Sequence, residues 1–231
     1  MSRKSKVVGV IAIAVVACTG SLALAAKTSP RNGNFETGSL KGWHTFTSMD
    51  SSGTGWYSYK KGDHAGDGVE ITPPPRRRGS QAPKSLYAPP QGKYAAYGFG
   101  TGGGPRILYR TLHLKSGKKI ALSMDVFYKN FANKFIAPNT LDSHAAKGNQ
   151  QYRIDLIKKG ADLDSLKDKD VIKNIFRTKK GDKLKRKPFK VSKDLSSLAG
   201  QTVTLRLAET DTEFFFYPGV DAVKLKQTKK H

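Results

Sequence analysis

The strongest constraint on the fold of this chain is an alternation of apolar and polar residues that recurs in short segments. Because successive side chains of a β-strand point to opposite faces, a period of two predicts a half-buried antiparallel strand. Residues 202–209 and 152–156 show this pattern. The clearest case is residues 119–128, where every second residue is large and apolar, namely Ile120, Leu122, Met124, Val126 and Tyr128.

Strand patterns continue along most of the chain, and long helical patterns are missing. Turn sequences separate the segments, as at residues 115–118 and 198–201. Only residues 161–167 have a helical pattern, enough for a turn or two. Many short strands with turns between them predict an all-β fold, a two-sheet antiparallel β-sandwich. The remaining candidate strands are residues 43–47, 55–59, 94–99, 106–114, 172–178 and 220–226.

The first 26 residues have the pattern of a signal peptide. Basic residues precede an apolar run at 7–16, and Ala23-Leu24-Ala25 supplies a small-x-small cleavage site. This pattern predicts a secreted or cell-surface protein whose mature form has no transmembrane span. Two alternatives stay open. Residues 15–18 also resemble a lipobox, which would anchor a lipoprotein through Cys18, and an uncleaved apolar run would hold the chain in a membrane.

The remaining residues, 27–231, are expected to form a single domain, because about 200 residues are enough to bury a sandwich core. Cys18 is the only cysteine, so the mature domain has no disulfide, cysteine-based zinc site or cysteine nucleophile. Long loops are expected at about 62–90, which holds two proline clusters, and at 130–149. We expect a monomer.

Five short motifs follow one another between residues 32 and 205. They are Asn32-Gly33-Asn34-Phe35-Glu36, Gly38-Ser39-Leu40-Lys41-Gly42-Trp43, Gly92-Lys93-Tyr94-Ala95-Ala96, Leu122-Ser123-Met124-Asp125-Val126 and Leu198-Ala199-Gly200-Gln201-Thr202-Val203-Thr204-Leu205. Together they resemble the jelly-roll, galactose-binding-like domains that include many carbohydrate-binding modules of exported bacterial proteins. The resemblance implies a jelly-roll β-sandwich and a non-catalytic protein that binds a carbohydrate or a cell-wall polymer.

The two ends of this region carry similar acidic signatures, with Glu36 after an N-terminal turn and Asp221 inside the last β-branched segment. In the family that the chain resembles, a structural calcium often lies near the first and last strands. The resemblance therefore implies that Glu36 and Asp221 bind calcium, together with a backbone carbonyl near Asn34. Calcium takes about six to eight oxygens, so two carboxylates do not complete a site, and a turn residue with a surface carboxylate is the alternative.

Sugar binding requires aromatic rings that stack on the ring faces of the sugar and polar side chains that satisfy its hydroxyl groups. Trp56 and Tyr59 are the aromatic candidates, although large rings belong to cores more often than to sites.

Four charged residues at outward positions of their strands are the polar candidates. If their strands are neighbours, they would form one ligand-binding patch on an exposed sheet face, and the alternative is a cross-strand ion-pair ladder without a ligand. The four are Asp125, Arg153, Asp155 and Arg206.

The chain is strongly basic, with a net charge of +23 that falls to +20 after the signal peptide is removed. The densest part of the charge lies within residues 179–193, and such a surface attracts anionic polymers. An electrostatic polyanion-binding surface protein is therefore the main alternative function, with no specific recognition of nucleic acid expected. Runs of charge also occur on solvated faces that bind no partner.

A polysaccharide hydrolase or lyase is the second alternative. Glu209, Asp211 and Glu213 occupy alternate positions and would project together from a strand, as paired catalytic carboxylates do. The chain has no nucleophile elbow, phosphate-binding loop or histidine spacing typical of a metal site. We therefore expect a protein that binds and does not catalyse.

Overall fold

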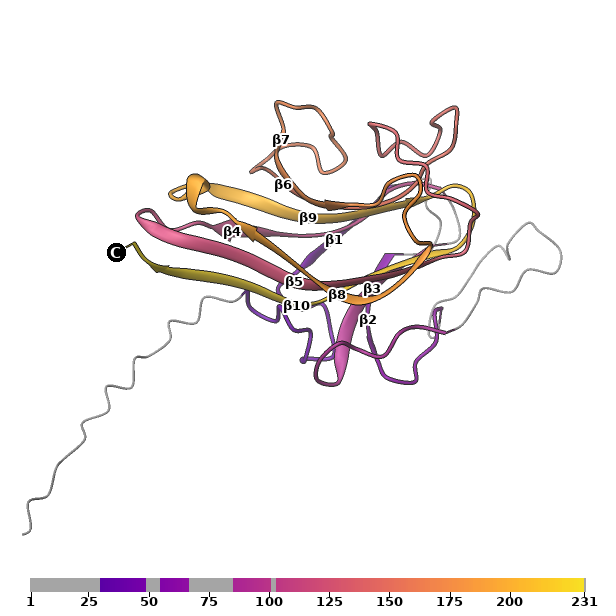
Figure 1. Cartoon of the computed structure of the whole chain (residues 1–231), viewed down its shortest axis with the longest axis horizontal. Coiled ribbons are helices and arrows are strands. Elements are labelled where there is room, and N and C mark those ends of the chain that lie inside the picture. The colour runs from indigo at the N-terminus through magenta and orange to yellow at the C-terminus, as the bar shows by residue number, and fades with distance from the viewer. Residues whose placement is uncertain (1–29, 49–54, 67–84, 101–102, 231) are drawn as a thin grey trace, which may run out of the picture.

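The computed structural model describes residues 30–48, 55–66, 85–100 and 103–230, and it consists of two antiparallel five-stranded sheets packed face to face (Figure 1). Sheet A has the strand order β1-β4-β9-β6-β7, and sheet B has the order β2-β3-β10-β5-β8. The predicted all-β sandwich is confirmed. The strands are β1 (His44–Thr47), β2 (Gly55–Lys60), β3 (Tyr94–Phe99), β4 (Arg106–His113), β5 (Lys118–Asn130), β6 (Gln150–Lys158), β7 (Val171–Arg177), β8 (Lys185–Asp194), β9 (Thr202–Asp211) and β10 (Phe216–Lys229).

Apolar side chains from the inner faces of both sheets form the core. In β5 the alternation works as predicted, since Leu122 and Met124 are fully buried while Ala121 is exposed and Ser123 is half-buried. Leu205 of β9 belongs to the same core cluster. Each such side chain contributes about 1.5–3 kcal/mol through its burial, so the inner faces fix which side of each strand is left for other roles.

The strand β8 was not predicted from the sequence, because its many charged residues obscure the alternation of apolar and polar positions. Phe189 and Val191 pack against the core, while the lysines around them are exposed. The strand lies at the edge of sheet B, where lysines and Pro188 discourage pairing with another chain. The helix predicted at 161–167 is wrong: those residues form turns, and the only helix in the described part of the chain is the 3-10 turn η1 (Ser196–Leu198).

The two ends of the domain lie side by side, as their signatures suggested. The Val223 amide donates a hydrogen bond to the Gly33 carbonyl at 2.8 Å. A Cβ atom at Gly33 would collide with the Val223 carbonyl oxygen, so this contact requires glycine. The N-terminal turn is thereby attached to β10, beside an irregularity in the pairing of β10 with β5 between Asp221 and Lys224.

The outer faces of the two sheets differ in what covers them. On sheet A, Leu141 and Leu166, from the connections on either side of β6, pack onto Ile107 and Ala208. One end of sheet B carries a second aromatic cluster beneath Leu86 and Tyr87, which includes Tyr59, Tyr97, Phe127 and Tyr217.

The two predicted loops contain no strand among their described residues beyond the isolated bridges His64–Ser85 and Ile136–Gln150. The predicted signal peptide, residues 1–26 with Cys18, lies outside the described residues. Within the described ranges, no helix is long and apolar enough to cross a membrane.

Candidate functional site

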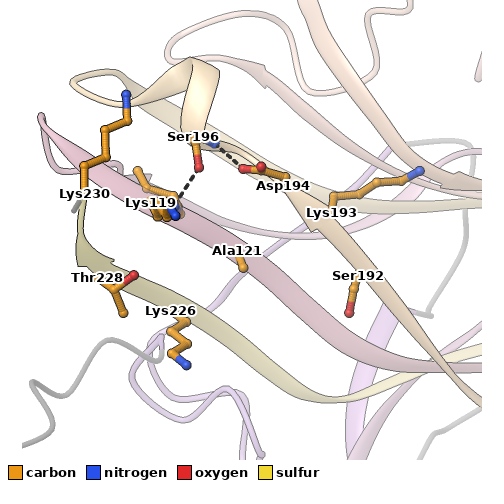
Figure 2. Close-up of a pocket in the computed structure, with 10 residues that line it drawn as sticks. Lys119, Ala121, Ser192, Lys193, Asp194, Ser196, Lys226, Thr228 and Lys230 are labelled. Atoms are coloured by element: carbon orange, nitrogen blue, oxygen red, sulfur yellow. Dashed lines mark hydrogen bonds between the residues drawn. The ribbon is translucent and has the colours of Figure 1, made fainter.

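The outer face of sheet B has a groove over the ends of three neighbouring strands, β10, β5 and β8 (Figure 2). In the strand register Lys226 of β10 lies opposite Ala121 of β5, and Ala121 lies opposite Asp194 of β8. Thr228 and Lys119 form the next row on the same face, because residues two apart in a strand point the same way. The cavity has a volume of about 530 Å³. We call this site the lysine groove.

Positive charge dominates the lining of the lysine groove. Its four lysines are all exposed, and it contains a single carboxylate, that of Asp194. Within the described part of the chain, none of the four lysines forms an ion pair at 4 Å or less, so their charges are available to a ligand. The four are Lys119, Lys193, Lys226 and Lys230.

Small side chains lie between the lysines. Ala121, Ser192 and Thr228 come from the three different strands, and Figure 2 shows Ala121 and Thr228 near Lys119 and Lys226. Small residues leave room for a chain to lie across the strands. The two hydroxyl groups can each donate and accept a hydrogen bond, as sugar hydroxyl groups do.

Side-chain hydrogen bonds hold the frame of the groove in place. The amide group of Gln227 joins the end of β10 to the β4–β5 turn, accepting from the Lys115 amide at 2.7 Å and donating to the His113 carbonyl at 3.2 Å. On the other side, the Ser196 amide donates to the Asp194 carboxylate at 2.7 Å. Hydrogen bonding from Ser196 lowers the pKa of Asp194 below its usual value, so this carboxylate stays ionised at neutral pH and partly offsets the lysines.

Three of the predicted ligand residues come together, but beneath the surface of sheet A. The Asp155 carboxylate accepts from Arg153 Nε at 2.7 Å and from Arg206 Nη2 at 2.9 Å. Arg206 also donates to the carbonyls of Leu163 and Ser165, both at 2.7 Å, in the connection that covers this face. Asp155 and Arg206 are fully buried and Arg153 is 6% exposed. The expected exposed patch is therefore wrong, and an ion-pair cluster takes its place because the β6–β7 connection folds over these strands.

The other three predicted ligand residues are placed apart from this cluster. Asp125 lies on β5 in sheet B, where its carboxylate pairs with Lys190 of β8 at 3.1 Å. Trp56 belongs to the core, and Tyr59 lies in the aromatic cluster with its hydroxyl donating to the Tyr87 carbonyl at 2.8 Å. The two rings are 4% and 2% exposed, which leaves them little surface on which a sugar could stack. A ligand role of these residues stays a prediction.

Glu36 and Asp221, the predicted calcium ligands, lie near one another at the junction of the chain ends. Glu36 accepts hydrogen bonds from the amides of Lys93 and Tyr94, and Asp221 accepts from the amides of Gln91 and Ala222. Burial raises the pKa of Asp221 to about 7, and the charges of Glu36 and Asp125 add to the effect.

Calcium binding by these two carboxylates stays a prediction, in which they would supply the acidic ligands. Asp221 is fully buried, and neither Asp221 nor Glu36 has an ion-pair partner among the described residues, so a cation between them would neutralise an uncompensated charge. Within the same described ranges, no group of three or more His, Cys, Asp or Glu side chains is arranged around a metal position. Backbone carbonyls and water would have to supply the remaining oxygens.

The carboxylates considered for hydrolysis do not form an open pair. Glu209 and Asp211 both bind the Arg106 guanidinium inside the sandwich, at 3.2 and 2.6 Å. All three residues are buried, and burial raises the pKa of both carboxyl groups while Arg106 opposes that effect. Glu213 is exposed and does not share this cluster. In the described structure the arrangement is that of a buried charge cluster.

Neither a family model nor a curated protein matches this sequence. Among solved structures, the chain is similar to the K1 cleaved adhesin domain of Lys-gingipain from Porphyromonas gingivalis W83, with 14% identity over 86% of this chain and 96% of that one, and a TM-score of 0.46. It is also similar to TmCBM61 in complex with β-1,4-galactotriose, with 9% identity over 89% and 100% of the two chains and a TM-score of 0.47. A third similar structure is a Stig cyclase from Fischerella sp. TAU, with 20% identity over 87% and 96%, and a TM-score of 0.38.

At these identities the likeness concerns the fold of the chain and not its function. What it binds has to be inferred from its own residues.

The lysine groove was missed by sequence reasoning, although a signal for it exists. Lys224, Lys226 and Thr228 occupy alternate positions near the end of β10, so they share one face, and Lys230 follows directly after the strand. The register that brings this face beside Lys119 and the residues of β8 cannot be read from one strand alone.

Proposed function

We propose that the protein binds an anionic polysaccharide or cell-wall polymer through the lysine groove and does not transform it. The observation that supports this most directly is the composition of the groove, which combines small and hydroxyl-bearing side chains with four lysines that form no ion pair among the described residues. An extended chain with carboxylate, sulfate or phosphate groups meets lysine charges along the rim and hydroxyl groups between them.

The positive charge continues beyond the groove along the edge of the sandwich. The edge strand β8 has four exposed basic side chains, Lys185, Arg186, Lys187 and Lys190. The connection that leads into it from β7 of sheet A is basic as well. This continuity supports an electrostatic contribution to polymer binding that exceeds the groove itself. The predicted sugar-binding and polyanion-binding functions thus combine in one proposal, an acidic carbohydrate as ligand.

The test is retention on polygalacturonate, with neutral β-1,4-galactan as the uncharged comparison. The double variant K119Q/K226Q should lose roughly five- to tenfold in affinity, about 0.5–0.7 kcal/mol for each exposed charge. Its matched control is K60Q/K61Q, which removes two exposed lysines at the end of β2, at the opposite edge of sheet B.

Titration calorimetry at two salt concentrations separates the possible outcomes. Loss of affinity only in K119Q/K226Q, and weaker binding at higher salt, supports the groove. Equal losses in both variants would assign binding to diffuse charge, and preference for the neutral galactan with little salt dependence would contradict the proposal.

We also propose that the mature protein is secreted or held at the cell surface, since residues 1–26 have the pattern of a signal peptide. Anchoring through an acylated Cys18 is the alternative route to the surface. Mass spectrometry of the exported protein distinguishes the two, because a start after residue 26 and a lipid-modified Cys18 give different N-terminal peptides.

A structural calcium at Glu36 and Asp221 is the remaining part of the proposal. The buried, unpaired Asp221 supports it. These two side chains would hold the ion at the junction of the chain ends, where it would stabilise the fold and would not contact the polymer.

A further inference from the structure

A second basic cavity lies on the opposite side of the sandwich, on the outer face of sheet A. It has a volume of about 210 Å³ and lies between the ends of β6 and β7 and the loop at residues 137–139. Its charged lining consists of Arg153, Arg177, Lys179 and Lys180, with no carboxylate. A cavity of this size is smaller than the roughly 300 Å³ at which drug-sized ligand sites begin, so it suits one small group.

The buried Arg153 gives this cavity a fixed cationic floor. Its Nε and Nη2 atoms donate to the two oxygens of Asp155, at 2.7 and 3.1 Å. The third guanidinium nitrogen, Nη1, does not bind Asp155. The Arg153 side chain is 7% exposed and lines the cavity. Asp155 is itself fixed by Arg206 and by Asn174, so the guanidinium of Arg153 is held in one orientation without a ligand.

Two arginines face each other across neighbouring strands at this cavity. Arg153 of β6 and Arg177 of β7 are direct register partners, and both line it. Like charges in directly opposite positions destabilise a sheet. Asp155 does not cancel this charge, because it is shared between Arg153 and Arg206. The nearest acidic group of the following turn, Asp182, accepts from the Lys179 amide and does not line the cavity.

The frame around the cavity is rigid. The Gln151 side-chain amide donates to the carbonyls of Pro138 and Thr140, which ties the loop to β6. The Thr178 hydroxyl accepts from the Tyr152 amide at 3.0 Å, which ties the end of β7 to the same strand. The positive groups are therefore arranged before any anion arrives.

We propose that this cavity is a separate anion site that takes a single oxyanion group, a carboxylate, a sulfate or a phosphate, between Arg153 and Arg177. A neighbouring cavity that shares Asn139 is lined by two carboxylates, Asp162 and Asp164, and one lysine, Lys167, so negative charge lies close to this site on the same face. An extended polyanion would be repelled there, whereas one compact group would not. The site does not depend on the lysine groove, which lies on the other sheet.

The test is an NMR titration of the mature chain with sodium sulfate at constant ionic strength, balanced with sodium chloride. Sulfate should cause saturable chemical-shift changes of the backbone amides of Thr178 and Lys180. Chloride should not cause them. The variant R177Q should weaken sulfate binding on the order of tenfold, since a charge-assisted hydrogen bond to the anion is lost. R177K should restore only part of it, because lysine lacks the planar fork of donors.

The matched controls separate a built site from general charge. R177Q/K179Q and K119Q/K226Q each remove two positive charges, on sheets A and B respectively, and only the first should abolish the saturable shifts. Polygalacturonate binding should weaken in K119Q/K226Q and stay unchanged in R177Q/K179Q. Failure of the groove proposal and failure of the anion site can therefore be told apart. Equal effects of both double variants, or shifts that grow linearly without saturation, would overturn the proposed anion site.

Parallel titrations with sodium phosphate and sodium glucuronate identify the source of the oxyanion. Tighter binding of glucuronate than of the two inorganic anions assigns the site to a sugar acid. Tighter binding of sulfate or phosphate assigns it to an ester group. Saturable binding of any of the three supports the site, and no saturation by all three refutes it.

Discussion

Charged residues face outward from both sheets, but the two sets have opposite surroundings. On sheet A, Arg153 and Arg206 share the buried Asp155 carboxylate, and the β6–β7 connection covers Arg206. On sheet B, the lysines of the groove are exposed and have no ion pair within the described residues. Lys119 and Lys226 occupy outward positions of their strands, as Arg153 and Arg206 do. What differs is the cover: on sheet A it turns the outward charges into a buried ion-pair cluster and leaves only Arg153 lining a small cavity, whereas on sheet B the lysines stay open to solvent.

Removing the shared carboxylate on sheet A should have the largest effect on stability. The substitution D155A leaves two buried guanidinium groups without their common partner, and we expect a loss of about 3–5 kcal/mol in the free energy of unfolding. Urea denaturation followed by circular dichroism measures it. D168A, at an exposed position of the covering connection, is the control and should change stability by less than about 0.5 kcal/mol. A similarly small loss in D155A would mean that water reaches the cluster.

Asp221 extends the comparison to a buried carboxylate that has no ion-pair partner in the described structure. Its folded-state pKa of about 7 lies above the unfolded value of about 3.9. The protonated form is therefore favoured by folding, and the contribution of Asp221 to stability is full below about pH 4 and is lost as the pH rises through 7. The slope is at most about 1.4 kcal/mol per pH unit in that window.

Calcium should reverse this pH dependence, because the ion binds the deprotonated carboxylate. We expect added calcium to raise Tm more at pH 8 than at pH 5, and chelation to lower it. D221N should remove both the calcium response and its share of the pH slope. The difference between the wild-type and D221N profiles isolates this residue from Glu209 and Asp211, whose pKa values are also raised. A calcium response that persists in D221N would place the ion elsewhere.

Most of the fold was predictable because the core follows from alternation. The pattern of residues 119–128 identified β5 and its buried face, and similar patterns located eight of the other strands within a few residues. The strand β8 escaped because its inward positions, Phe189 and Val191, are outnumbered by lysines. An edge strand packs apolar residues on the core and carries charged residues that prevent pairing with another chain. In β8 the charged residues obscure the apolar pattern.

The candidate site was less predictable, because it depends on contacts between segments distant in sequence. Parity correctly placed Arg153 and Arg206 on outward positions, yet it could not show that the carbonyls of Leu163 and Ser165 would cover Arg206. Asp125 has the same parity but belongs to the other sheet, and only the strand order reveals that. A face is a local property of a strand, whereas exposure is a property of the whole fold.

The smallest expected effect comes from the exposed ion pair on sheet B, Lys190 with Asp125, which contrasts with the buried cluster on sheet A. Its side chains are 64% and 20% exposed, so water and salt screen the 3.1 Å contact. A double-mutant cycle with K190A and D125N should give a coupling of about 0.2–1 kcal/mol that shrinks as salt is added. Asp221 lies directly opposite Asp125 in the register, so K190A alone should cost slightly more at pH 8 than at pH 5, where Asp221 is protonated. A coupling above about 2 kcal/mol that does not respond to salt would mean that this pair is shielded like the cluster on sheet A. Exposure would then not be what separates the two faces.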